Sequence, residues 1–155
     1  MKMEYSIEKI ALKYGLITFG LLSTYFLLLT SFGLVHRIEF RLFNAIIMFY
    51  GCFTAVGIAK QRLKDFNFLK GYGSGLLTAL LASFLFSFFG IIYLQFIDPS
   101  FIQEIKSNEL LGIYQNKFIA CAQIFIEGTA SGFLFTHGAV MWFKKPILAE
   151  SRQEK

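Results

Sequence analysis

Residues 71–99 read GYGSGLLTALLASFLFSFFGIIYLQFIDP, and from Gly71 to Ile97 this stretch contains no charged residue. An α-helix rises about 1.5 Å per residue, so the 27 charge-free positions would form a helix about 40 Å long. The hydrocarbon core of a typical bilayer is only about 30 Å thick. The stretch therefore predicts a transmembrane helix, around which the rest of the chain can be interpreted.

Small residues recur at every fourth position of this helix, and they are Gly71, Gly75, Ala79, Ser83 and Ser87. Helices in lipid associate through close backbone approach and interhelical hydrogen bonds, so a row of small side chains predicts a packing face. A row that lines a path for a substrate is the less favoured interpretation. Four phenylalanines lie mostly off the row, and we expect them to face lipid: Phe84, Phe86, Phe88 and Phe89.

Three other runs of the sequence are also long and apolar enough to be membrane spans. Residues 14–35 and 42–59 carry no charge, and residues 118–143 carry a single charge, that of Glu127. Together with residues 71–97, these runs predict an all-α fold, an integral membrane bundle of four transmembrane helices.

The composition supports this class of protein. Hydrophobic residues make up 55% of the chain and charged residues only 16%, whereas soluble domains contain about 25% charged residues. A length of 155 residues allows one domain, which we place at residues 1–148, with a polar cytoplasmic tail over residues 149–155.

Two other spans carry small residues at similar spacing. Gly128 and Gly132 form a GxxxG pattern in the fourth span, and Gly51, Ala55 and Ala59 recur every four residues in the second. Both patterns predict faces on which another helix packs closely.

The connector after the third span begins with a helix-start signal. Asp98 is a favourable N-cap residue, and Pro99 suits the first position of a helix. The residues that follow have one apolar and one polar side. We therefore expect a short interfacial helix between the third and fourth spans.

Lysine and arginine are distributed unequally between the segments outside the spans. Residues 1–13 contain three, and the connector 60–70 and the C-terminal tail contain four each, against two in each of the other connectors. Basic residues are retained on the cytoplasmic side. The sequence therefore predicts a multi-pass protein of the inner (cytoplasmic) membrane with both termini in the cytoplasm. Because the net charge of +5 comes from these flanks, no nucleic-acid partner is expected.

Glu127 is the one charged residue within the four predicted spans, ten residues after Lys117 and so about 15 Å along the helix. A central acidic residue costs at least about 2.5 kcal/mol, so we expect it to face protein or water and to have a partner. Gln123 and Ser131 lie one turn either side, and His137 lies about 15 Å further along; these four are the candidate polar site. Three side chains of similar depth are candidate hydrogen-bond donors to it: Tyr25, Tyr50 and Ser87.

The sequence contains none of the common motifs for soluble-type catalysis. A Walker loop, GxSxG, HExxH and paired-cysteine metal sites are all missing, and the two histidines lie toward opposite faces of the membrane. We therefore predict no catalytic residue, no metal site and no cofactor.

Three segments of the chain resemble a known family. They are Lys13-Tyr14-Gly15-Leu16, the end of the second span at Gly57-Ile58-Ala59-Lys60, and Phe96-Ile97-Asp98-Pro99-Ser100-Phe101. With these motifs the chain, from about Ile7 to Trp142, resembles the domain-of-unknown-function family 4199. The resemblance implies a small four-helix protein of the bacterial inner membrane with no assigned activity, and it supplies no catalytic residue.

Three functions remain open at this point. The leading hypothesis is an accessory or interaction protein in the lipid bilayer that packs with itself, as a homodimer, or with another membrane protein. The alternative is a small transporter or channel subunit that uses Glu127 as a proton or cation site. An intramembrane enzyme, the third, would need two convergent titratable groups, and the candidates Glu127 and His137 are too far apart along one helix.

Overall fold

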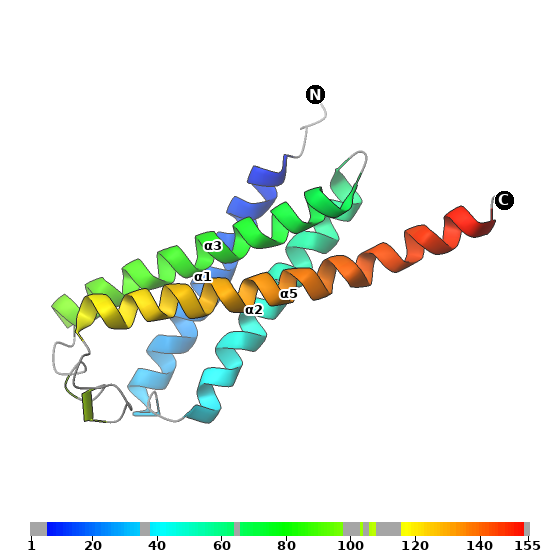
Figure 1. Ribbon diagram of the computed structural model, residues 1–155. Helices are drawn as coiled ribbons and strands as arrows, with labels where there is room; N and C mark the ends of the chain where they lie inside the picture. Colours follow the sequence, from blue (N-terminus) through cyan, green and yellow to red (C-terminus); the bar gives the residue numbers. More distant parts are fainter. Residues whose placement is uncertain are drawn as a thin grey trace.

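The computed structural model describes residues 6–34, 38–63, 66–97, 103, 106–107 and 116–153. These residues form four long helices and one short π-helix, and none of them lies in a strand (Figure 1). The elements are α1 (Ile7–Ser31), α2 (Ile38–Arg62), α3 (Phe68–Ile92), η1 (Tyr93–Ile97) and α5 (Lys117–Gln153).

Each long helix contains a segment that is long and apolar enough to cross a membrane, and the segments are Ile7–Ser31, Leu42–Arg62, Phe68–Ile97 and Lys117–Phe143. The predicted all-α bundle of four membrane-spanning helices is thus confirmed. The third segment joins α3 and η1, because the π-helix begins at the residue after Ile92.

Local hydrogen bonds set where the helices begin. The Ser6 hydroxyl accepts a hydrogen bond from the backbone N–H of Lys9, and the Asn67 side chain accepts one from that of Lys70. Capping of this kind satisfies backbone donors that the first helical turn leaves free. The first helix therefore begins at Ile7, before the charge-free run at residue 14, because its cap and not the apolar run marks the start.

The predicted interfacial helix falls mostly outside the described residues, as do Asp98 and Pro99. Within that segment Gln103 and residues 106–107 are helical.

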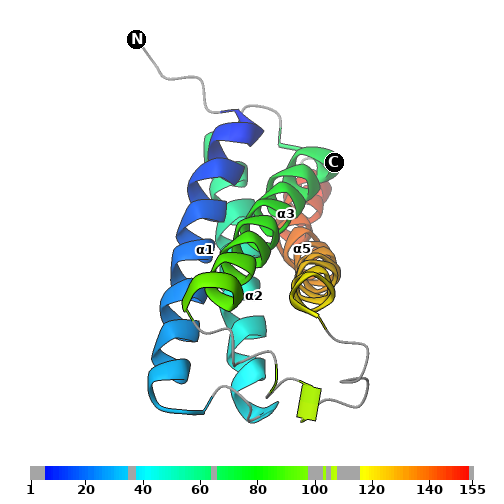
Figure 2. The same ribbon diagram turned by 90° about the vertical axis from the view of Figure 1, so that its left-hand side faces the viewer.

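The four helices form a bundle in which α2 and α3 each pack against both α1 and α5. Figure 2 shows α1 and α5 on opposite sides, with α3 in front and α2 behind. In Figure 1, α5 runs well beyond the ends of the other helices toward the C-terminus.

The closest helix pair is α3 and α5, which meet through their small residues. A Cβ built on Gly132 would overlap the Cβ of Ala79, and one on Gly75 would lie 2.6 Å from Cγ2 of Thr136. One on Gly128 would overlap the hydroxyl of Ser83. Since α3 positions rise as α5 positions fall, the helices are antiparallel with two small-residue rows in register. Gly71, Gly75, Ala79, Ser83 and Ser87 are all buried, as is Gly132, and Gly128 is half-buried.

The phenylalanines of α3 divide into two pairs. Phe84 and Phe88 are exposed, as expected for side chains that face lipid. The expectation was wrong for Phe86 and Phe89, which are half-buried and pack edge-to-face on Phe26 of α1 with ring centroids 6.0 and 6.2 Å away. Edge-to-face packing of aromatic rings is favourable, and α1 covers this side of α3.

Polar contacts hold α5 at both ends of its span. The Lys117 ammonium donates a hydrogen bond to Oε1 of Gln95 at 3.1 Å, and the Lys60 ammonium donates one to the Phe143 carbonyl at 3.2 Å. Lysines at the ends of spans reach toward the membrane interfaces. These contacts mark the two ends of the segment in which the candidate site lies.

Candidate functional site

Among the described residues, the side of α5 that faces away from α2 and α3 is largely exposed along its span. We define the outer seam as the row at steps of four and three residues that contains Glu127: it consists of Glu127, Ser131, Leu134, Gly138 and Met141. All are exposed apart from Ser131, which is half-buried. This spacing places side chains on one stripe of a helix, and it is the spacing with which two helices pack side by side.

The carboxyl group of Glu127 lies on this outer seam and not inside the bundle. It is ten residues from Lys117 in a span that ends at Phe143, and therefore close to the middle of the bilayer. Among the described residues, none forms a hydrogen bond or an ion pair with it. The partner that we expected from the sequence is thus not within the described part of the chain.

The three expected donors lie elsewhere. The Ser87 hydroxyl donates a hydrogen bond to the Cys121 carbonyl at 2.7 Å, which links α3 to α5. The Tyr25 ring packs on the Phe43 ring of α2, and Tyr50 is 67% exposed on the outer side of α2.

The structure brings together only part of the candidate polar site. Gln123 is exposed and Ser131 half-buried, one turn before and one turn after Glu127 on the same side of α5. His137 is exposed too, but its ring packs edge-to-face on Phe68 of α3, with centroids 6.5 Å apart. It therefore belongs to the α3 side of the helix and not to the group around Glu127.

Gly138 is a seam residue that the sequence pattern did not single out. A Cβ built there would meet nothing within 4 Å, whereas the same atom on Gly132 would overlap a side chain of α3. Glycine inside a helix is less favourable than alanine by roughly 0.5–1 kcal/mol. Packing among the described residues gives no reason for this glycine, and the signal for it was its distance of eleven residues from Glu127.

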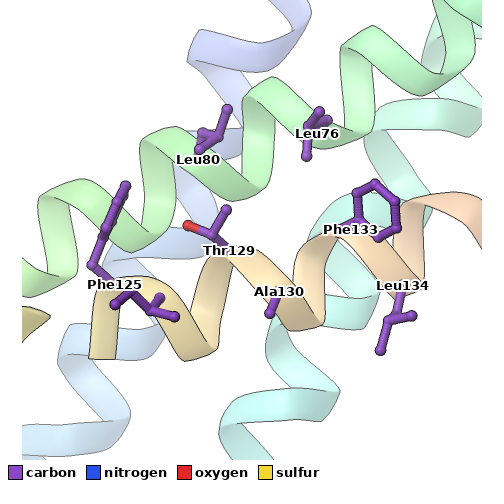
Figure 3. A pocket seen from close by; sticks show the side chains of 8 residues that line it. Leu76, Leu80, Phe125, Thr129, Ala130, Phe133 and Leu134 are labelled. Atoms are coloured by element: carbon purple, nitrogen blue, oxygen red, sulfur yellow. The ribbon is translucent and has the colours of Figure 1, made fainter. Parts of the chain in front are cut away.

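An apolar groove of about 700 Å³ runs beside the seam, between α3 and α5 (Figure 3). It is lined by Leu76, Leu80, Phe125, Ile126, Thr129, Ala130, Phe133 and Leu134. Thr129 is the one polar residue in this lining, and its hydroxyl is buried with no hydrogen-bond partner in the described part of the chain. The lining suits hydrocarbon, either acyl chains or apolar side chains, and it offers no ligands for an ion.

Hydroxyl groups also lie in the middle of the bundle, and sequence analysis did not identify them as a group. Thr18 and Thr78 donate to the carbonyls of Tyr14 and Ser74 in their own helices, each at 2.7 Å. Among the described residues, the Ser83 hydroxyl is buried without a hydrogen-bond partner at the contact of α3 with α5, and the Thr136 hydroxyl lies against the Cys52 thiol. Thr18 and Thr78 thus form their hydrogen bonds within their own helices, which is how threonine is accommodated in a membrane interior.

Comparison with known proteins identifies the family. No curated protein and no solved structure is similar enough to the chain to count as a match. The family model described as "Protein of unknown function (DUF4199)" matches residues 13–137, from the first turns of α1 to His137 in α5. Because this match covers most of the chain, the protein belongs to the DUF4199 family of proteins of unknown function.

Proposed function

We propose that this chain is an accessory or interaction protein of the bacterial inner membrane, and that it associates with its partner through the outer seam of α5. The observation that supports this proposal is the position of Glu127, exposed at mid-span with no polar partner among the described residues. Lipid tails cannot hydrogen-bond to a carboxyl group. A second protein on the seam would provide the missing hydrogen bonds.

The free-energy cost of exposing Glu127 to lipid can be compared with the stabilisation that a partner helix provides. An acidic side chain at the centre of a lipid-facing helix costs at least about 2.5 kcal/mol, and it is tolerated where it pairs or faces water. A hydrogen bond between membrane helices contributes about 0.6–2 kcal/mol. Association through Glu127 therefore offsets a large part of that cost, and the exposed apolar side chains of the seam add close packing.

A transporter or channel subunit remains the second candidate, with Glu127 as a proton or cation site. Intramembrane carboxyl groups are often part of ion pathways. In this chain Glu127 faces outward, and the neighbouring groove has an apolar lining. Such a path would have to form between chains, so this function also requires association at the outer seam.

Native electrophoresis of membranes solubilised in mild detergent tests the association. We expect the unmodified chain to migrate in a complex larger than the monomer and Glu127→Leu to shift toward the monomer. Tyr50→Leu is the matched control, because it removes another exposed polar side chain, from α2, and should leave the complex intact. A monomeric unmodified chain, or equal migration of all three proteins, would contradict the proposal.

We further propose that both termini lie in the cytoplasm, as the distribution of basic residues favours. Alkaline phosphatase folds to its active form only in the periplasm, so a fusion to the C-terminus should be inactive and a fusion after Gly33 active. An impermeant thiol reagent should label Ser107→Cys from outside, because Ser107 is exposed in the connector between the third and fourth spans. Activity of the C-terminal fusion would reverse the orientation.

A further inference from the structure

We infer that the partner on the outer seam is a second copy of this chain, in the same membrane orientation, and that the two Glu127 carboxyl groups hydrogen-bond to each other across a two-fold axis. This inference rests on the proposed function, because it names the partner for the same surface. It makes the site of Glu127 incomplete in a single chain.

The depth of Glu127 in the bilayer favours a second copy as the partner. A parallel, symmetric pair places each residue of the seam opposite its own counterpart, so Glu127 meets Glu127 at the same level of the bilayer. Any other protein would have to carry a polar group at that depth. A second copy of this chain carries its own Glu127 at that depth.

A carboxyl group is also chemically complementary to a second carboxyl group. A carboxyl group in an apolar medium is stable in its neutral form, in which it carries one donor and further acceptor capacity. Two such groups are therefore complementary to each other. The Ser131 hydroxyl, one turn further along the seam, is likewise both donor and acceptor, so the interface can satisfy its polar atoms without a second kind of side chain.

A steric feature of the outer seam supports a closely packed partner independently of Glu127. Gly138 lies on the same stripe, and a Cβ there would meet only open space. Glycine at a helix surface lets the backbone of another helix approach closely. The other two glycines of this stretch, Gly128 and Gly132, face α3, whereas Gly138 lies on the seam and faces open space.

Disulfide cross-linking in native membranes tests the surface. We expect Leu134→Cys to form a covalent dimer on mild oxidation and Phe133→Cys to form little or none. Both positions are exposed, at 67% and 49%, and both line the groove, but Phe133 lies about 100° further around the helix, where its ring packs edge-to-face on Tyr72 of α3 with centroids 5.7 Å apart. The natural Cys52 and Cys121 are buried, so the unmodified chain provides the background. Cross-linking at Phe133→Cys in preference to Leu134→Cys would overturn the assignment of the seam.

Self-association of the purified chain in detergent tests the partner. We expect Glu127→Leu to weaken the dimer by about 3- to 30-fold, the range of measured hydrogen bonds between membrane helices. Glu127→Gln should retain it, because amide groups also pair with each other. Gly138→Leu should weaken it without lowering the melting temperature of the bundle, since the added side chain points away from the other helices.

The outcomes separate this inference from the proposed function. If the purified chain is monomeric while the chain in membranes runs in a complex that Glu127→Leu disrupts, the seam binds a different protein and the second copy is wrong. If no complex forms in either preparation, both proposals fail. If the purified Glu127→Leu variant dimerises as well as the unmodified chain, the proposed hydrogen bond between the two carboxyl groups is wrong.

Discussion

Ala79→Leu is expected to destabilise the bundle by about 1–3 kcal/mol, the usual cost of forcing extra carbon atoms into a well-packed interior. Ala79 is fully buried, and its Cβ occupies the space that Gly132 of α5 leaves free. A leucine side chain would have to push the two helices apart. Thermal unfolding in detergent measures the effect.

Phe88→Leu is the control for this experiment, because Phe88 is 55% exposed on the lipid side of the same helix and its replacement should change the melting temperature little. A second control tests the contact itself. Gly132→Ala should destabilise the bundle when made alone, and Ala79→Gly in the same chain should restore much of the loss, since it removes the overlapping Cβ. Equal melting temperatures of Ala79→Leu and Phe88→Leu would mean that the faces of α3 are assigned in reverse.

Gly51→Ala is expected to have a similarly large effect at the contact of α1 with α2. A Cβ on Gly51 would overlap the hydroxyl of Thr18, which is held in place by its hydrogen bond to the Tyr14 carbonyl. We expect a loss of about 1–3 kcal/mol, because Thr18 is buried and would have to shift within a packed interior.

Gly20→Ala makes the same chemical change where a Cβ would meet nothing within 4 Å. It should be neutral or should raise stability by up to about 1 kcal/mol, because alanine favours a helix over glycine. We therefore predict that Gly51→Ala lowers the free energy of unfolding and that Gly20→Ala does not. Unfolding in detergent measures both changes. Loss of stability in Gly20→Ala would show that this side of α1 is covered.

The number and type of the helices could be predicted from sequence because a membrane span depends only on length and on the absence of charge. The rows of small residues were also visible, since they repeat every four positions. Which helix each row contacts was not visible. Phe86 and Phe89 illustrate the limit: their periodicity separates them from the small-residue row of α3, but it cannot reveal that α1 lies on that side.

The outward position of Glu127 could have been predicted by combining two patterns. Gly128 and Gly132 face α3 in the structure, and at 3.6 residues per turn Glu127 then lies more than 90° away from the direction of Gly132. A close glycine contact and an inward-facing Glu127 are therefore incompatible on one helix. The small residues determine the rotation of α5 about its own axis, and this rotation decides whether Gly132 or Glu127 faces α3.

The interlocking of α3 and α5 also restricts how the bundle can move. At three contacts spaced by four residues, a glycine of one helix lies against a larger residue of the other, so a shift of α5 by one or two residues would bring side chains against backbone. The two helices can exchange one stable register for another only by a jump of about one turn, or roughly 5–6 Å. Small axial displacements between them are thus disfavoured, and we expect α3 and α5 to move along their common axis as one rigid body.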